Sequence, residues 1–86
     1  MRPYTVVIAP RAKKQIEKLP IKTKEKIAYV LASVLAYDPF LGNALKAELK
    51  GLYSYRVGDY RIIYNIIRHH LVIQIIKVMH RREVYR

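Results

Sequence analysis

The second half of the chain contains the run LYSYRVGDYRIIYNIIRHHLVIQIIKV at residues 52–78. Its β-branched and aromatic residues are typical of strands. Gly58-Asp59 indicates a tight turn between two of them, and Arg68-His69-His70 indicates a second turn. The run therefore predicts three consecutive strands, at residues 53–57, 60–67 and 71–78. The last two are almost wholly apolar, which is typical of central strands covered on at least one face.

The first half of the chain predicts one strand and two helices. Residues 4–8 alternate with the period of a strand, and Pro10 stands where a helix can begin. Pro20 separates this helix from a second one, which ends near Asp38-Pro39 because the residue before proline avoids the helical region. The core-facing stripe of the second helix consists of Ile27, Val30, Leu31, Val34 and Leu35.

The predicted element order is β-α-α-β-β-β, within a single domain at residues 1–86. We expect an α+β fold in which a helical hairpin packs on one face of a mainly antiparallel four-stranded sheet. The other face of the sheet would be partly open. Residues 40–50 form a connector whose second half, 44–50, is either a short helix or an extended arm. Residues 80–86 are expected to be a polar tail.

Composition points to a polyanionic partner. Seventeen Lys and Arg residues against six Asp and Glu residues give 86 residues a net charge of +11. Such a surplus fits nucleic acid, an anionic membrane or an acidic protein, although a merely solubilising surface stays open. There is no cysteine, and no apolar run is long enough to span a bilayer. We therefore expect a soluble cytoplasmic protein with no membrane association.

Arginine and tyrosine are interleaved in the second half. Arg56 and Arg61 lie inside predicted strands, where a cation needs an edge, a cleft or a partner. Guanidinium groups bind phosphate through paired hydrogen bonds, and aromatic rings stack on unpaired bases, so the pattern suits single-stranded RNA. The tyrosines at 53, 55, 60 and 64 equally fit ordinary half-buried sheet positions. Tyr85 lies outside any predicted strand.

Two longer motifs carry a resemblance to a known family. They read LKGLYSYRVGDYRIIY at residues 49–64 and VMHRREVY at residues 78–85, and Lys18-Leu19-Pro20 closes the first helix ahead of them. Together they resemble the RelE/ParE toxin superfamily, on the RelE side, over nearly the whole chain. The resemblance implies the RelE-like fold and the toxin role in a type II toxin–antitoxin system.

The implied activity is that of a ribosome-dependent endoribonuclease, an mRNA interferase that cleaves messenger RNA in the A site. In such toxins a 2′-OH attacks the adjacent phosphorus and the 5′-oxygen leaves, with no metal and no cofactor. The implied partners are the ribosome, messenger RNA and a cognate acidic antitoxin similar to RelB. Complexes of this kind are often heterotetramers.

The resemblance also implies site residues. Arg61 matches the arginine that stabilises phosphate charge, and Arg81 matches one that stabilises charge or donates a proton. Tyr85 matches a tyrosine that stacks on or orients the substrate nucleotide. Arg56 stands where RelE members have one of two strand lysines, and Ser54 replaces the other. Arg56, with Lys50 and Arg82, is expected to bind substrate.

The loss of a lysine at Ser54 leaves the general base open. Glu48 is similar to the glutamate that serves as base in the YoeB branch, and His80 is similar to the histidine acid of that branch. A carboxylate near arginine stays ionised and can accept a proton, and histidine titrates close to neutrality. The alternatives are an exposed ion pair of Glu48 with Lys46 or Lys50, and an incidental turn position for His80.

Two other functions stay open. A ParE-like protein would share the fold but inhibit DNA gyrase by protein contact, without nuclease activity. A degenerate toxin would retain only antitoxin binding, and the departure at Ser54 keeps this alternative in view. The presence of Arg61, Arg81 and Tyr85 together favours the nuclease.

Overall fold

The protein is built on one five-stranded sheet, with the strand order β1-β5-β4-β3-β2. The computed structural model describes residues 2–84. The strands are β1 (Thr5–Ile8), β2 (Asn43–Ala44), β3 (Leu52–Val57), β4 (Tyr60–Ile67) and β5 (Val72–His80). β1 runs parallel to β5, and every other neighbouring pair is antiparallel. The α+β fold class and the predicted three-strand meander are confirmed.

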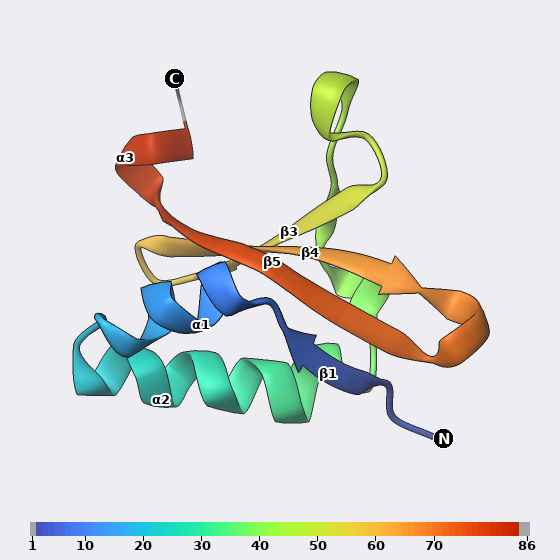
Figure 1. The fold of residues 1–86 in the computed structure, drawn as a ribbon, viewed down its shortest axis with the longest axis horizontal. Coiled ribbons are helices and arrows are strands. Elements are labelled where there is room, and N and C mark those ends of the chain that lie inside the picture. The colour runs from blue at the N-terminus through green and yellow to red at the C-terminus, as the bar shows by residue number, and fades with distance from the viewer. Residues whose placement is uncertain (1, 85–86) are drawn as a thin grey trace.

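Two helices cover one face of this sheet. α1 (Pro10–Glu17) begins at a proline, whose nitrogen needs no hydrogen-bond partner in the first turn, and α2 (Ile21–Val30) directly follows Pro20. A single π-helical turn, Leu31–Leu35, extends α2. Both helices lie on the same side of the sheet (Figure 1). The core between the two layers includes Ala12, Ile27, Leu31, Leu35, Ile62, Tyr64, Ile73 and Ile75.

The observed sheet has five strands, one more than the four expected from the sequence. β2 is only two residues long and pairs with β3 through Asn43 and Ala44, inside the segment expected to be a connector. Gly42 makes this approach possible, because a Cβ at that position would collide with the Tyr64 hydroxyl and with the Ser54 carbonyl oxygen. A short edge strand of this kind leaves little exposed backbone for unwanted pairing.

The prediction of a polar tail from residue 80 is wrong as far as residue 84. β5 continues to His80, and a short helix, α3 (Arg81–Val84), follows it. The His80 backbone N–H donates to Glu83 Oε1 over 2.8 Å, and the Arg81 N–H donates to the Asp59 carbonyl oxygen over 2.7 Å. These bonds satisfy two donors at the start of α3 and fix the helix to the β3–β4 turn.

Residues 45–51 form an arm between β2 and β3. The Leu45 N–H donates to the Leu52 carbonyl oxygen, and a single 3₁₀ turn spans Ala47–Leu49. The backbone turns sharply at Ala47 (φ 57°) and at Gly51 (φ 99°). The arm therefore combines the short helical turn and the extended backbone that the sequence left open. It projects from the sheet on the side away from α1 and α2 (Figure 1).

Tyr64 links the core to the segment before β2 through a hydrogen bond. Its hydroxyl donates to the Pro39 carbonyl oxygen over 2.6 Å, and its ring stacks on Tyr53 with centroids 5.8 Å apart. The side chain is fully buried, and this burial raises the pKa of Tyr64 to about 12. Tyr53, Tyr55 and Tyr60 also pack against the core. These four tyrosines are therefore structural residues of the helix-covered face and do not share a surface with the strand arginines.

Candidate functional site

The face of the sheet opposite the helices carries the strand cations. Side chains alternate between the two faces of a strand, so Arg56 and Arg61 point away from their buried neighbours Val57 and Ile62. Arg56 pairs with Arg61 across β3 and β4, and Arg61 pairs with Met79 on β5. We call this surface the open face. It is the side on which α3 and the arm project (Figure 1).

A bulge in β5 adds a third cation to the open face. Ile73 and Ile75 are fully buried on the helix side, so strict alternation would bury Lys77 as well. The register shifts between Ile63 and Tyr64, and Lys77 instead pairs with Ile63 while Val78 takes the buried position. Sequence reasoning missed Lys77 for this reason. The sequence held one sign of the bulge: Lys77 is charged, although it continues the series of buried residues Ile73 and Ile75.

Arg56 and Arg61 form a like-charge pair. They stand directly opposite each other in the ladder, an arrangement that destabilises a sheet. Arg56 Nε donates to the Gly58 carbonyl oxygen over 3.0 Å, whereas Arg61 is half-buried and makes no ion pair within residues 2–83. Two arginines paired across the ladder, neither of them in an ion pair within residues 2–83, form a surface suited to an anion.

The turn between β3 and β4 positions Arg81 as well. The Gly58 carbonyl oxygen accepts a hydrogen bond from Arg56 Nε, and the Asp59 carbonyl oxygen accepts one from the Arg81 N–H. Two of the predicted site arginines are therefore positioned by the same turn. Arg81 Nε also lies 3.9 Å from Asp59 Oδ1. Both side chains are about 60% exposed (61% and 62%), so the ion pair is weak and an incoming anion can replace the carboxylate.

His80 lies on a different side from Arg61. Its ring packs edge-on against the Tyr60 ring at 5.1 Å, and Tyr60 contacts the core on the helix-covered face. His80 Nδ1 accepts from the Arg82 N–H over 3.2 Å, which uses the neutral form of the imidazole. The structure therefore does not bring His80 and Arg61 together, and the exposed Arg82 is held beside His80 instead.

Glu48 and Lys50 lie on the arm. Both are exposed, and Glu48 forms no ion pair with Lys46 or Lys50. The structure thus places a free carboxylate on the same side of the sheet as Arg61, without a contact between the two. Tyr85 lies outside the described residues.

Ser54 is a feature of the site that sequence reasoning set aside. It pairs with Asn43 on one side and Ile63 on the other, so its side chain lies on the open face. The residue is 2% exposed, and its hydroxyl has no hydrogen-bond partner within the described part of the chain. A buried hydroxyl without a partner is costly to the stability of the fold.

The described residues hold neither a cluster that could bind a metal ion nor a helix that could span a membrane. Within the described residues, no three His, Cys, Asp or Glu side chains come close enough to bind a metal ion together. Over the same range, none of the helices has the length and apolar character needed to cross a membrane.

A helical hairpin on one face of a mainly antiparallel sheet is the fold of RelE toxins. Residues 6–85 match the family model described as the ParE toxin of the type II toxin–antitoxin system parDE, and the chain belongs to this family of toxins. The predicted membership of the RelE/ParE superfamily is thereby confirmed.

The similar proteins include two toxins of Mycobacterium tuberculosis. Toxin RelG is 34% identical over 98% of both chains. Toxin RelE is 35% identical over 98% of this chain and 88% of its own. In the M. tuberculosis toxin–antitoxin complex RelBE2, the matched chain is 33% identical with a TM-score of 0.89, covering 96% of this chain and 97% of that one. The archaeal RelE–RelB complex of Pyrococcus horikoshii matches with 30% identity and a TM-score of 0.77, over 95% and 99%.

Proposed function

We propose that this toxin is an endoribonuclease that cuts messenger RNA in the ribosomal A site. The observation that carries the proposal is the cluster on the open face, where Arg56 and Arg61 stand opposite each other and the same turn holds Arg81. Attack of a 2′-OH on the neighbouring phosphorus places extra negative charge on the phosphoryl oxygens. Donors that are already in position stabilise such charge without reorganising.

The arginines have separate tasks in this proposal. Arg61 binds the scissile phosphate, because it is half-buried and its partner across the ladder is another cation. Arg56 binds a neighbouring phosphate, together with Lys50 from the arm and Arg82 from α3. Arg81 exchanges its weak contact with Asp59 for the developing charge on the phosphate. Arginine keeps its proton in proteins, so Arg81 stabilises charge and does not act as the acid.

The proton transfers fall to Glu48 and His80 in this proposal, and both need a movement. Glu48 accepts the 2′ proton once the arm closes over the open face, and its carboxylate is free to do so. His80 protonates the leaving oxygen in its imidazolium form, once Nδ1 releases the Arg82 N–H and takes up a proton and the ring turns away from Tyr60. Tyr85 orients the nucleotide, as the resemblance implies. The reaction as proposed requires no metal or cofactor.

The charge of the molecule supports RNA and an acidic protein as partners. A net charge of +11 favours the ribosome, whose RNA backbone is a dense polyanion, and makes binding fall steeply with salt. Relatives with this fold have been solved in complex with RelB antitoxins. We therefore propose that an acidic RelB-like antitoxin binds this toxin in the cytoplasm, in a heterotetramer.

Induced expression in bacteria tests the nuclease proposal. The wild-type toxin is expected to stop growth and translation, and primer extension is expected to find codon-phased cuts in ribosome-bound messages. Arg61→Ala should lower cleavage by roughly 10²–10³-fold, as loss of one charge-stabilising donor does elsewhere. Arg68→Ala is the matched control: it removes an exposed arginine from the other end of β4, where the guanidinium lies 4.9 Å over Phe40. Uncut transcripts with wild-type toxin, or equal cutting by both variants, would overturn the proposal.

The description of the matched family keeps one alternative open, inhibition of DNA gyrase in the manner of ParE. In that case transcripts stay intact and DNA damage depends on gyrase. A toxin that has lost its activity would produce no phenotype at all. The same induction experiment separates these outcomes from the nuclease.

A further inference from the structure

A second basic surface lies outside the candidate site, along α1. Arg11, Lys14 and Lys18 line a hollow of about 500 Å³, with Pro10 and Gln15 between them. All three cations are exposed, and their spacing of three and four residues places them along one side of the helix. Among the described residues, no carboxylate lines the hollow. We call these three cations the α1 strip.

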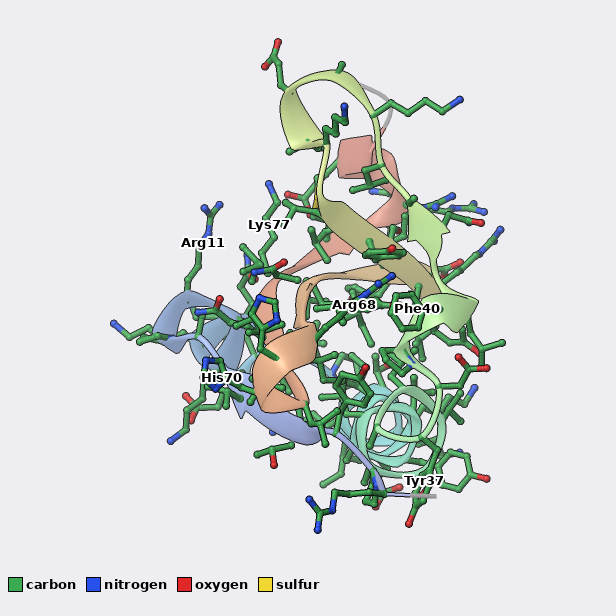
Figure 2. The ribbon with its side chains drawn as sticks, turned by 90° about the vertical axis from the view of Figure 1, so that its right-hand side faces the viewer. Arg11, Tyr37, Phe40, Arg68, His70 and Lys77 are labelled. Carbon is green, nitrogen blue, oxygen red and sulfur yellow. The ribbon has the colours of Figure 1, made fainter. Side chains whose placement is uncertain are left out.

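The α1 strip is held in a fixed position relative to the open face. Gln15 Oε1 accepts from the Val78 backbone N–H over 2.8 Å, so α1 takes the place of a strand partner beside the second half of β5. Lys77 is the residue before Val78 and lies on the open face. Arg11 and Lys77 extend toward the same side of the sheet (Figure 2). Positive charge therefore continues from α1 through Lys77 toward Arg61.

The chemistry of the α1 strip favours a nucleic-acid backbone. Flexible cations at the rim of a shallow hollow neutralise phosphates without selecting a base. A protein partner would need buried apolar anchors, which dominate the binding energy at protein interfaces. The lining residues of this hollow offer none apart from Pro10, whereas exposed apolar side chains such as Ile21 and Tyr29 lie on α2.

We propose that the α1 strip binds the phosphate backbone of RNA outside the segment that occupies the open face. This inference rests on the proposed RNA substrate and extends its footprint past the sheet edge. It assigns to Arg11, Lys14 and Lys18 a positioning role: they hold the RNA and do not touch the reacting phosphate.

The salt dependence of RNA binding tests this inference. Anisotropy would be measured over a series of salt concentrations with a long single-stranded RNA whose 2′-hydroxyls are methylated, so that cleavage cannot occur. Each phosphate contact contributes about 0.7 to the slope of log K against log salt for a single strand. Lys14→Gln/Lys18→Gln should therefore lower the slope by about 1.4. Arg11→Gln, a second variant, should lower it by about 0.7.

The control variant is Lys22→Gln/Lys26→Gln, which removes two exposed lysines with the same spacing from α2. It should keep the wild-type slope, and a methylated trinucleotide should bind all variants alike. Equal slopes for the α1 and α2 variants would overturn the inference, because only net charge would then matter. An unchanged slope combined with weaker binding of an acidic peptide would also overturn it and make the strip a protein-docking surface. Absence of cleavage by the wild-type toxin would instead refute the nuclease proposal and leave the binding result to stand on its own.

Discussion

Arg61 contributes to the site at a cost to the fold. It stands opposite Arg56 in the β3–β4 ladder, and like charges in this position destabilise a sheet by about 0.2–1 kcal/mol. The alternation of strand residues could be predicted from the sequence, and with it the common face of these two arginines. The sequence did not show which face of the sheet the helices cover. The tyrosines proved to lie on the covered face, away from the two arginines.

Arg61→Gln is expected to stabilise the isolated toxin in low salt, because the variant removes the repulsion between the two guanidinium groups. The gain in melting temperature should shrink as salt is added, since salt screens exposed charges. Thermal unfolding at several ionic strengths measures both effects. A lower melting temperature for the variant in low salt would mean that Arg61 supports the fold, contrary to this account.

Tyr64 predicts how stability depends on alkaline pH. Burial raises its pKa to about 12, whereas tyrosine in an unfolded chain titrates near about 10. Its contribution is therefore fully present below pH 10 and is lost as the pH rises through about 12. The loss amounts to roughly 3 kcal/mol, at about 1.4 kcal/mol per pH unit. Tyr64→Phe should lower the free energy of unfolding by about 1–2 kcal/mol at neutral pH, because the hydrogen bond to Pro39 is lost. The free energy of unfolding of this variant should fall less than that of the wild type as the pH rises from about 10 to about 12. Denaturant unfolding at a series of pH values tests this, and parallel decline of both proteins would refute it.

α1 shows how an element can complete a sheet without being a strand. β1 pairs only with Val72–Ile75, so the rest of β5 would present a free edge. Gln15 satisfies the Val78 N–H at that edge. The sequence predicted α1 from Pro10 and its apolar stripe, but the role of Gln15 depends on a bond between residues 63 positions apart.

Gln15→Met tests this role. It keeps the length of the side chain and removes the acceptor, so the partly buried Val78 N–H loses its partner at a cost of roughly 1–3 kcal/mol. Gln15→Glu retains an oxygen at the same position and should cost clearly less. Free energies of unfolding from urea titrations compare the two. Equal costs would show that the hydrogen bond from the Val78 N–H to Gln15 contributes little.

The short elements account for most of what the sequence could not predict. β2 and α3 are too short for any periodicity to identify them, and each depends on a tertiary contact: Gly42 beneath Tyr64, and Asp59 beside Arg81. The three long strands are rich in strand-forming residues and bounded by turn signals, and both hairpin helices carry apolar stripes, so these elements were predicted close to their observed bounds. The bulge that turns Lys77 outward leaves only a single charged residue as its signal.

At the scale of the whole molecule, the layers separate stability from function. The helix-covered face holds the core, and the open face, α3, the arm and the α1 strip carry the cations assigned to RNA binding. The total charge and the family motifs were evident from the sequence. The spatial arrangement of the charge was not, because it depends on which residues α1 and the β3–β4 turn bring alongside β5.

The most direct test of the central claim is a nuclear magnetic resonance titration of the labelled toxin with methylated RNA. The account predicts that amide signals of Arg56, Arg61, Lys77 and Arg81 shift together and saturably, while those of the exposed side of α2 stay in place. Shifts confined to α2, with the open face unaffected, would contradict it.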